Sequence, residues 1–393
     1  MLPMPESFDS LLKDELSRLA EAHQLRSRRI VIPLDAVHVE IDGRQCVNFC
    51  SNNYLGLTHH PRIVAAVGKA AAKFGAGAGA AGLISGFSPQ HAATESVVAA
   101  WKGTEATILL PSGYQANQAA IQALAGLGKN HGGVRFLVDK LAHASLLDAI
   151  RASGAVWRVF PHNGMAKLKR LLHEADAEQL QVVVTESIFS MDGDAADLKS
   201  LVELKRARPF VLLLDEAHAS GVYGANGSGL AAEFGLTDAV DIFVVTFSKA
   251  VGCIGGAICA SKSFCDAAVN LGRAYIFSTS IPPAIAAGIE EAIHVMRDEP
   301  QRQQRVRTLA REVRARLRSK GMVLPDGDSP IVPIIVGEES AAIQLADKLL
   351  KKNLLVGAVR PPTVPRGTSR LRVTLNCEHS QEEIDRLIEA IAR

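Results

Sequence analysis

The feature that most constrains this chain is the alternation of short apolar runs with helical patterns across its middle. The run from Val211 to Leu214 is apolar at every position, which indicates a strand covered on both faces. Helical patterns lie between such runs, so the sequence predicts an α/β fold with a mainly parallel sheet. The predicted strands are Ala106–Leu110, Arg135–Val138, Val156–Phe160, Gln181–Thr185, Phe210–Leu214 and Asp241–Thr246. The predicted helices between them include Gln115–Ala125, Ser145–Ser153, Met165–Glu174 and Leu198–Ala207.

The pattern changes after about residue 282. A helical pattern extends from Pro282 to about Lys320, and shorter strands and helices follow it, which predicts a smaller α+β domain. These later elements are the strands Ile331–Val336, Leu354–Val359 and Arg370–Leu375, a helix near Ser340–Lys352 and a last helix from Ser380.

The first part of the chain predicts a helix, a basic turn at Arg26–Arg29 and a strand pair over Val37–Phe49. We therefore divide the chain into three parts. Residues 1–55 are predicted to form an N-terminal helix and strand segment, residues 56–285 a large α/β domain that binds the ligand, and residues 286–393 the C-terminal α+β domain.

The composition argues against several classes of protein. The chain carries 43 Lys and Arg against 41 Asp and Glu, so its formal charge of +2 gives no electrostatic footprint for nucleic acid. Within Arg302–Lys320 apolar residues recur every three or four positions, which indicates the solvated face of an amphipathic helix. Apolar runs of membrane-spanning length, signal-peptide patterns and C-x-x-C pairs do not occur. We therefore expect a cytoplasmic protein with reduced cysteines and neither a metal site nor a membrane partner.

Reactive side chains follow several predicted strands at their carboxyl ends, where parallel sheets bind ligands. The turn at Gly113 leads into a helix whose first backbone N–H groups suit an anion. His143, Asp215 with His218, and Lys249 follow three later strands. Each has a structural explanation when taken singly. Asp215 and His143 could cap helices, His218 could be a hydrogen-bonded core histidine, and Lys249 could be a surface lysine.

Together these residues place an acid, two imidazoles, a lysine and an anion cradle on one edge of one sheet. Pyridoxal 5'-phosphate requires a lysine for covalent attachment, an acid for its pyridinium nitrogen and an anion site for its phosphate. An imidazole stacked on the ring would complete the set. The sequence therefore predicts a pyridoxal-phosphate enzyme.

The segment Thr246-Phe247-Ser248-Lys249-Ala250, with Gly252 and Gly255-Gly256 after it, resembles the cofactor-lysine segment of the α-oxoamine synthases. These are fold-type I pyridoxal-phosphate enzymes that join an amino acid to an acyl thioester and release carbon dioxide. The resemblance covers nearly the whole chain. It includes the segments Ser51–Leu57, His143–Ser145, Glu186–Asp194, Asp215–His218 and Ser278–Pro283.

The resemblance implies catalytic roles at four positions. Lys249 would hold the cofactor and later move the Cα proton. Asp215 would pair with the ring nitrogen, His218 would hydrogen-bond the phenolic oxygen, and His143 would stack over the ring. The resemblance also assigns cofactor contacts to Gly113, Tyr114, Ser190 and Thr246, and it implies a homodimer in which Ser278 and Thr279 reach the phosphate bound by the other subunit.

The resemblance also implies how substrates bind. Arg372 would grip the amino-acid carboxylate, because a planar guanidinium fork suits that task, and Asn52 would assist it. Arg26 and Thr363 would face the acyl substrate. The stretch Arg360–Arg372 looks most like the branch that condenses L-alanine with a pimeloyl thioester, carried by coenzyme A or an acyl carrier protein, on the route to biotin.

One stretch departs from the family pattern. Ala80-Ala81-Gly82 stands where the family usually has Gly-Ser-Arg or Gly-Thr-Arg, which affects contacts to the thioester or to the subunit interface. Three alternatives remain open: a synthase that joins glycine to an acyl-CoA, an aminotransferase on the same fold, and a non-catalytic relative. The run Gly224–Gly229 follows no strand closely, so we predict a surface turn there rather than a nucleotide-binding loop.

Overall fold

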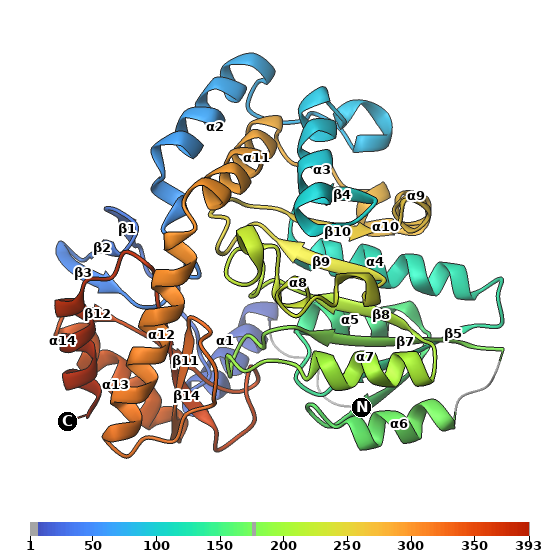
Figure 1. Ribbon diagram of the computed structural model, residues 1–393. Helices are drawn as coiled ribbons and strands as arrows, with labels where there is room; N and C mark the ends of the chain where they lie inside the picture. The colour runs from blue at the N-terminus through green and yellow to red at the C-terminus, as the bar shows by residue number, and fades with distance from the viewer. Residues whose placement is uncertain (1–6, 175–177, 393) are drawn as a thin grey trace.

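The structure is a computed structural model, and it describes residues 7–174 and 178–392. Residues 1–6 of the predicted first part lie outside the described residues, as does residue 393 of the last part. Figure 1 shows a larger body with a central sheet and a smaller body beside it, which the long helix α12 (Gln301–Ser319) flanks.

A seven-stranded sheet forms the centre of the larger body, in the order β4-β10-β9-β8-β7-β5-β6 (Figure 1). All strands run parallel except β10 (Gly256–Ala260), which pairs antiparallel with both of its neighbours. The parallel strands are β4 (Ala106–Leu110), β5 (Val134–Asp139), β6 (Val156–Phe160), β7 (Leu180–Glu186), β8 (Val211–Asp215) and β9 (Ile242–Thr246). The predicted strands are therefore present, and β10 is an addition that the sequence pattern did not reveal.

Both faces of the sheet are buried, as the continuous apolar strands predict. On β8, Leu213 packs into one apolar layer and its neighbours Leu212 and Leu214 pack into the other. Four helices lie over the first layer: α4 (Gly113–Gly128), α5 (Ala144–Ser153), α9 (Lys262–Leu271) and α10 (Arg273–Ile276). The second layer lies against α3 (Pro89–Lys102), α6 (Met165–His173), α7 (Leu198–Ala207), α8 (Leu230–Glu233), α11 (Pro283–Asp298) and α12.

The predicted helical stretch from Pro282 to Lys320 is two helices, α11 and α12. The break falls at Glu299 and Pro300, because the residue before a proline is disfavoured in helical conformation. Helix α11 packs beside α2 (Pro61–Phe74) in Figure 1.

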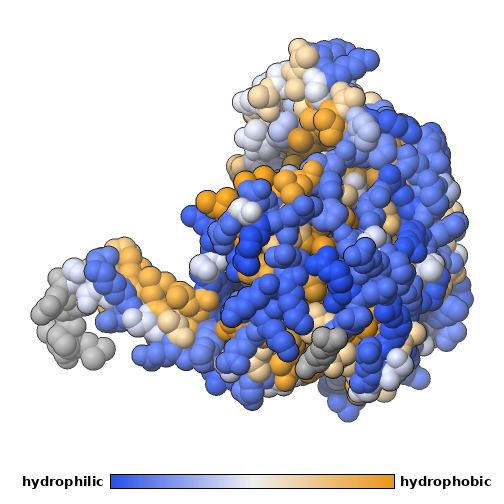
Figure 2. Space-filling view, turned by 90° about the vertical axis from the view of Figure 1, so that its left-hand side faces the viewer, coloured by the Kyte–Doolittle hydropathy of each residue, from blue (hydrophilic) through white to orange (hydrophobic). Residues whose placement is uncertain are grey.

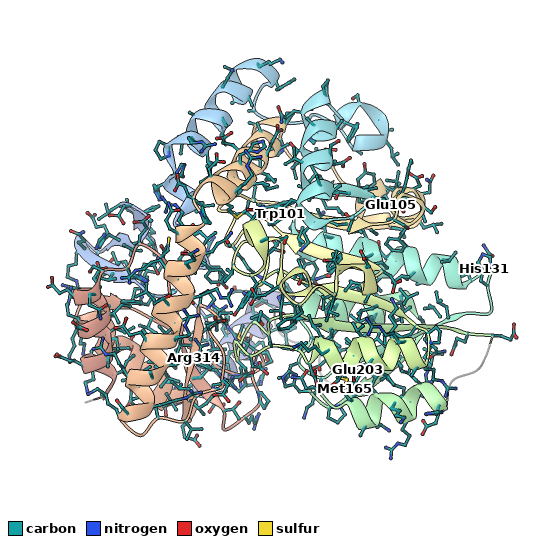
Figure 3. The ribbon with its side chains drawn as sticks, in the orientation of Figure 1. Trp101, Glu105, His131, Met165, Glu203 and Arg314 are labelled. Atoms are coloured by element: carbon teal, nitrogen blue, oxygen red, sulfur yellow. The ribbon has the colours of Figure 1, made fainter. Side chains whose placement is uncertain are left out.

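Helix α12 is not only a solvated basic face. Most of its arginines form ion pairs, for example Arg307 with Glu233 and Asp328. Arg314, labelled in Figure 3, is 1% exposed and donates to the backbone carbonyls of Ser329 and Ile331. The expectation that all of these arginines face solvent is therefore wrong for Arg314, whose charge is satisfied by carbonyl oxygens instead of water.

The smaller body contains two sheets. One is the antiparallel sheet β11-β14-β13, formed by Ile331–Gly337, Ser369–Thr374 and Gly357–Val359. The other has the order β1-β2-β3-β12, formed by Ile32–Pro33, His38–Ile41, Arg44–Asn48 and Leu354–Leu355. The helices α13 (Glu339–Lys351) and α14 (Gln381–Ala392) complete this body.

Asp42 and Gly43 form the two-residue loop between β2 and β3. Their φ angles of 50° and 72° match the type I′ turn that is common in such hairpins. β3 also pairs parallel with β12 from the far end of the sequence. The N-terminal strands therefore lie in one sheet with a C-terminal strand, while the three-part domain division stays a prediction.

Helix α1 (Phe8–Glu21) has no buried residue. Figure 2 shows it projecting from the molecule with hydrophobic side chains along one face. Phe8 is 76% exposed, and Leu11, Leu12 and Leu16 are also exposed. Among the described residues, the helices are all too short or too polar to cross a membrane, and all six cysteines are free thiols.

Candidate active site

A cavity of about 240 Å³ opens at the carboxyl ends of the parallel strands. Lys249 and Thr246 enter it from the end of β9, and Asp215 enters from the end of β8. The first turn of α4 also lines the cavity, with Gly113 next to Thr246. The lining residues are Ser112, Gly113, Tyr114, Asn117, His143, Ser145, Glu186, Asp215, Ala217, Val244, Val245, Thr246, Ser248 and Lys249. A larger groove of about 780 Å³ beside α12 contains none of the predicted site residues.

Asp215 is fixed by a neighbouring amide. Asn117 on α4 donates through Nδ2 to Asp215 Oδ2 at 2.7 Å and also to Ser145 Oγ at 2.9 Å. The backbone N–H of Ala217 donates to the other carboxylate oxygen at 2.9 Å. Asp215 is only 4% exposed, so these donors hold its carboxylate in one orientation.

Lys249 begins a row of contacts between side chains. Its Nζ lies 2.9 Å from Nε2 of His218, and Nδ1 of His218 lies 2.6 Å from the hydroxyl of Tyr54. The Tyr54 hydroxyl donates to Asn52 Oδ1 at 3.2 Å. This row of contacts joins the end of β9 to the loop that follows β3.

The row continues to an arginine of the smaller body. Arg372 on β14 donates through Nη1 to Asn52 Oδ1 and to Thr374 Oγ1, both at 3.0 Å. Its Nε donates to the backbone carbonyl of Ser190 at 2.6 Å. The structure therefore brings Arg372, Asn52 and Ser190 together beside the lysine, as the resemblance implies.

Burial sets the protonation of the basic groups. Desolvation lowers the pKa of Lys249 to about 8, although the carboxylates of Asp215 and Glu186 oppose the shift. Desolvation also holds the pKa of His218 well below its usual range, and Lys249 adds to that effect. The pKa of His143 is lowered by the same cause. Two neutral imidazoles and an amine that can lose its proton near pH 8 therefore share the site.

His143 has a structural role as well as a place in the cavity. Its Nδ1 accepts from the backbone N–H of Ser145 at 3.2 Å and lies 2.7 Å from Ser145 Oγ, so it caps α5. The cap fixes the ring at the cavity wall.

The remaining predicted residues lie outside the cavity lining. Ser278 accepts from Gln115 Nε2 at 3.0 Å, just beyond the first turn of α4, and Thr279 is exposed. Arg26 donates to the backbone carbonyl of Pro361 at 3.2 Å, which holds the N-terminal linker against the loop that carries the exposed Thr363.

Three residues of the site were not assigned a role from the sequence. Tyr54 and Asn117 act through contacts between segments that are far apart in the chain. Glu186 ends β7 and pairs in register with Asp215 on β8. It is 2% exposed, and its Oε1 has no hydrogen-bond partner among residues 7–174 and 178–392. Desolvation and Asp215 raise the pKa of Glu186 well above its usual range. Only its position after a predicted strand could have marked it in the sequence.

The residues present fit pyridoxal phosphate. A Cβ atom at Gly113 would lie 2.9 Å from the Cβ of Thr246, so only glycine leaves this corner of the cavity open. The first turn of α4 directs backbone N–H groups into that corner, which suits a phosphate. Within the described part of the chain, Asn117 Oδ1 and Glu186 Oε1 are buried at the same cavity without a hydrogen-bond partner. The cavity therefore offers an anion cradle, a fixed carboxylate and a lysine in the arrangement that this cofactor needs.

Comparison with known proteins agrees with this site. The chain matches the family described as "Aminotransferase class I and II" over residues 44–391. It therefore belongs to this family of pyridoxal-phosphate enzymes. The predicted enzyme class, fold and cofactor are confirmed.

Its sequence relatives are more specific. The 8-amino-7-oxononanoate synthases of Saccharophagus degradans and Trichlorobacter lovleyi are 36% and 40% identical over 389 and 385 residues. Each alignment covers 98% of this chain, and they cover 96% and 97% of the relatives. The resemblance to α-oxoamine synthases is confirmed.

Solved structures show the same fold. Sphingomonas wittichii serine palmitoyltransferase has a TM-score of 0.90 at 30% identity, with 99% of this chain and 97% of that chain covered. A serine palmitoyltransferase variant from S. paucimobilis with bound pyridoxal phosphate and myriocin has a TM-score of 0.91 at 29% identity, covering 98% and 96%. The 8-amino-7-oxononanoate synthase of Francisella tularensis has a TM-score of 0.76 at 25% identity, covering 88% and 97%.

Proposed function

We propose that this enzyme is an acyltransferase that condenses L-alanine with a pimeloyl thioester to give 8-amino-7-oxononanoate, carbon dioxide and the free thiol. The observation that carries the proposal is the row of contacts from Lys249 through His218, Tyr54 and Asn52 to Arg372. This row supports a role for Arg372 in binding the substrate carboxylate and a role for Lys249 in moving a proton. The synthases at 36% and 40% identity support the choice of substrates.

Pyridoxal phosphate, when bound, supplies an electron-accepting ring that stabilises negative charge at the amino-acid Cα. Lys249 would hold the cofactor through Nζ, and the same Nζ would accept the Cα proton of the amino acid. Its lowered pKa, about 8, leaves a useful fraction of the amine neutral. Asp215 would keep the ring nitrogen protonated, and Asn117 and the Ala217 N–H hold its carboxylate in place.

Arg372 binds the carboxylate of the amino acid and thereby orients the Cα–H bond toward Lys249. Its present acceptors, Asn52 Oδ1 and the Ser190 carbonyl, keep the guanidinium extended at the site before substrate arrives. His143 covers the cavity from α5. Arg26 and Thr363 lie on the two adjoining surface segments and would face the longer acyl substrate.

The working enzyme is a homodimer in this proposal. Ser278 and Thr279 lie outside the cavity of their own chain, which fits a contact to the phosphate in a second copy. Exposed apolar side chains on neighbouring segments support an interface: Ile84 is 81% exposed and Phe277 is 72% exposed. Ala81 forms a β-bridge with Thr279 in this region. The six free cysteines support a location in the reducing cytoplasm.

The proposal is tested by steady-state assays of pimeloyl-CoA and pimeloyl carrier protein with L-alanine, glycine or L-serine. We expect turnover with alanine and release of one carbon dioxide per thiol. Faster turnover with glycine or serine would assign the enzyme to another branch of the family, which the high TM-scores to serine palmitoyltransferases make the natural second candidate. Amino-group transfer without a thioester would indicate an aminotransferase.

The dimer is tested by light scattering of the purified enzyme. The variant Ile84→Asp should lower the measured mass at micromolar concentration, because it places a charge in the apolar interface. A monomeric native protein with full activity would contradict the shared site.

A further inference from the structure

A completely buried ion pair lies directly behind the candidate active site. Nζ of Lys102, the last residue of α3, lies 2.5 Å from Oε2 of Glu216, and the two side chains are 1% and 0% exposed. Trp101, which precedes Lys102 and is labelled in Figure 3, donates through Nε1 to the carbonyl of Asn226 at 2.9 Å. Glu216 immediately follows Asp215.

Glu216 is hydrogen-bonded on every side. Its Oε1 accepts from the backbone N–H of Ala231 at 3.0 Å, and its own N–H donates to the carbonyl of Val244 on β9 at 2.8 Å. Lys102 also donates to the carbonyl of Ser228. The Lys102 ammonium lies 4.9 Å from the centre of the Phe243 ring. A buried pair recovers its desolvation cost only with such complete satisfaction.

The pair explains the glycine run that the sequence analysis assigned to a surface turn. Gly227 and Gly229 are buried, so that expectation is wrong for these two positions. Gly229 has a φ of 123°, and a Cβ atom there would lie 1.9 Å from Glu216 Oε2. The glycine turn therefore packs closely against the Glu216 carboxylate.

The backbone of Glu216 also shapes the site. The carbonyl of Glu216 accepts from the N–H groups of Ala219 at 3.1 Å and Ser220 at 2.8 Å, which forms the turn that presents His218. The residues on either side of Glu216 thus reach the cavity, while its own side chain is anchored behind it. A shift of the anchor moves both Asp215 and His218.

We propose that Lys102 and Glu216 are positioning residues, which fix the Asp215–His218 segment so that its acid and its imidazole meet the cofactor and Lys249 in the reactive geometry. The inference rests on the proposed roles of Asp215 and His218, and it adds the ion pair as the part that holds them. Neither residue touches the cavity.

The test uses the holoenzyme and the variants Lys102→Met and Glu216→Gln. We expect kcat and the rate of Cα proton exchange of L-alanine to fall roughly 10- to 100-fold, as for small misplacements of catalytic groups, while KM for alanine changes less than about threefold, because Arg372 is untouched. The pH titration of the visible band of the bound cofactor should also shift. Lys102→Arg, which keeps the charge, should recover at least part of the lost kcat.

The matched control is Lys205→Met, which breaks the ion pair of Lys205 with Asp241 at the start of β9, far from the cavity. Melting temperature is measured for all variants. If Lys102→Met and Glu216→Gln lower the melting temperature but leave kcat and the titration at native values, the pair is structural and the proposal fails. If Lys102→Met does not fold, Glu216→Gln, which is isosteric, decides alone by the same readouts.

Failure of this inference is distinguishable from failure of the proposed function. If Asp215→Asn also leaves Cα exchange unchanged, the assigned role of Asp215 is wrong. If Asp215→Asn is impaired and the ion-pair variants are not, only the positioning role is wrong.

Discussion

Nζ of Lys249 lies 2.9 Å from Nε2 of His218 in a buried site. Nδ1 of the same imidazole lies 2.6 Å from the Tyr54 hydroxyl, which also donates to Asn52 Oδ1 at 3.2 Å. Burial holds the pKa of His218 well below its usual range, so the lysine faces a neutral imidazole and not a second cation.

Replacing Lys249 by alanine should abolish turnover, with a loss of at least about 10³-fold, because the covalent anchor and the base are lost together. Borohydride treatment of the holoenzyme followed by peptide mapping should place reduced cofactor on the Lys249 peptide. The exposed Lys262, which pairs with Asp266 one helical turn away, is the control: Lys262→Ala should behave as native. Turnover by the Lys249→Ala variant would refute the site.

Asp215→Asn should preserve the fold and slow Cα proton exchange of L-alanine by about two orders of magnitude or more, since a neutral amide does not keep the ring nitrogen protonated. Asn117→Ala should have a smaller effect in the same direction, because it frees the carboxylate without removing its charge. Exchange followed by NMR in deuterated water measures both. Equal rates in native enzyme and Asp215→Asn would exclude the electron-sink role.

Tyr54→Phe should destabilise the protein by about 1–3 kcal/mol, because it leaves the buried Nδ1 of His218 without a partner. It should also raise KM for the amino acid, since Asn52 loses the hydroxyl that helps to hold it beside Arg372. Urea unfolding and steady-state kinetics measure the two effects. A native KM would show that Asn52 is held by Arg372 alone.

Arg372→Lys should raise KM for alanine by about 10- to 100-fold, because an ammonium cannot bind a carboxylate with two parallel hydrogen bonds. The cofactor should still bind, since Lys249, Asp215 and the first turn of α4 are unchanged. Titration of the visible band with alanine separates the two effects. Weak cofactor binding with unchanged KM would place Arg372 in a different role.

The free energy of unfolding should fall at alkaline pH because His162 loses its proton there. Its ring lies between Asp139 at 3.1 Å and Asp194 at 2.6 Å, and hydrogen bonds to these two acids outweigh desolvation and raise its pKa to about 10. Because the folded pKa exceeds the unfolded value of about 6.5, the stabilisation is complete below about pH 6.5 and is lost as pH rises through 10. Urea unfolding at pH 6 and pH 10 should show this loss, and His162→Gln should remove the difference.

The predictability of the fold varied with strand composition. β8 was evident because Val211–Leu214 is apolar at every position, whereas β10 is Gly-Ala-Ile-Cys-Ala and has one β-branched residue. β10 is a strand because β4 and β9 both pair with it, and pairing of that kind is not encoded locally.

Some residues of the site could be predicted from the sequence, and others could not. Lys249, Asp215 and His143 could be placed because each follows a strand, and the sheet brings strand ends together. Tyr54 and Asn117 could not, because their roles depend on contacts with His218, 164 residues away, and with Asp215, 98 residues away. The sequence assigned no role to Glu216, and only the structure shows its side chain anchored behind the cavity by Lys102.

The parallel pairing of β3 with β12 imposes an order on folding. Leu354 and Leu355 reach the ladder beside Val47 and Asn48 only after some three hundred intervening residues have been synthesised. Until then the β2–β3 hairpin presents an unpaired edge to the ribosome-bound chain, and such edges recruit other strands. We therefore expect pulse-labelled hydrogen exchange during refolding to protect Val47 late, after the strands of the central sheet.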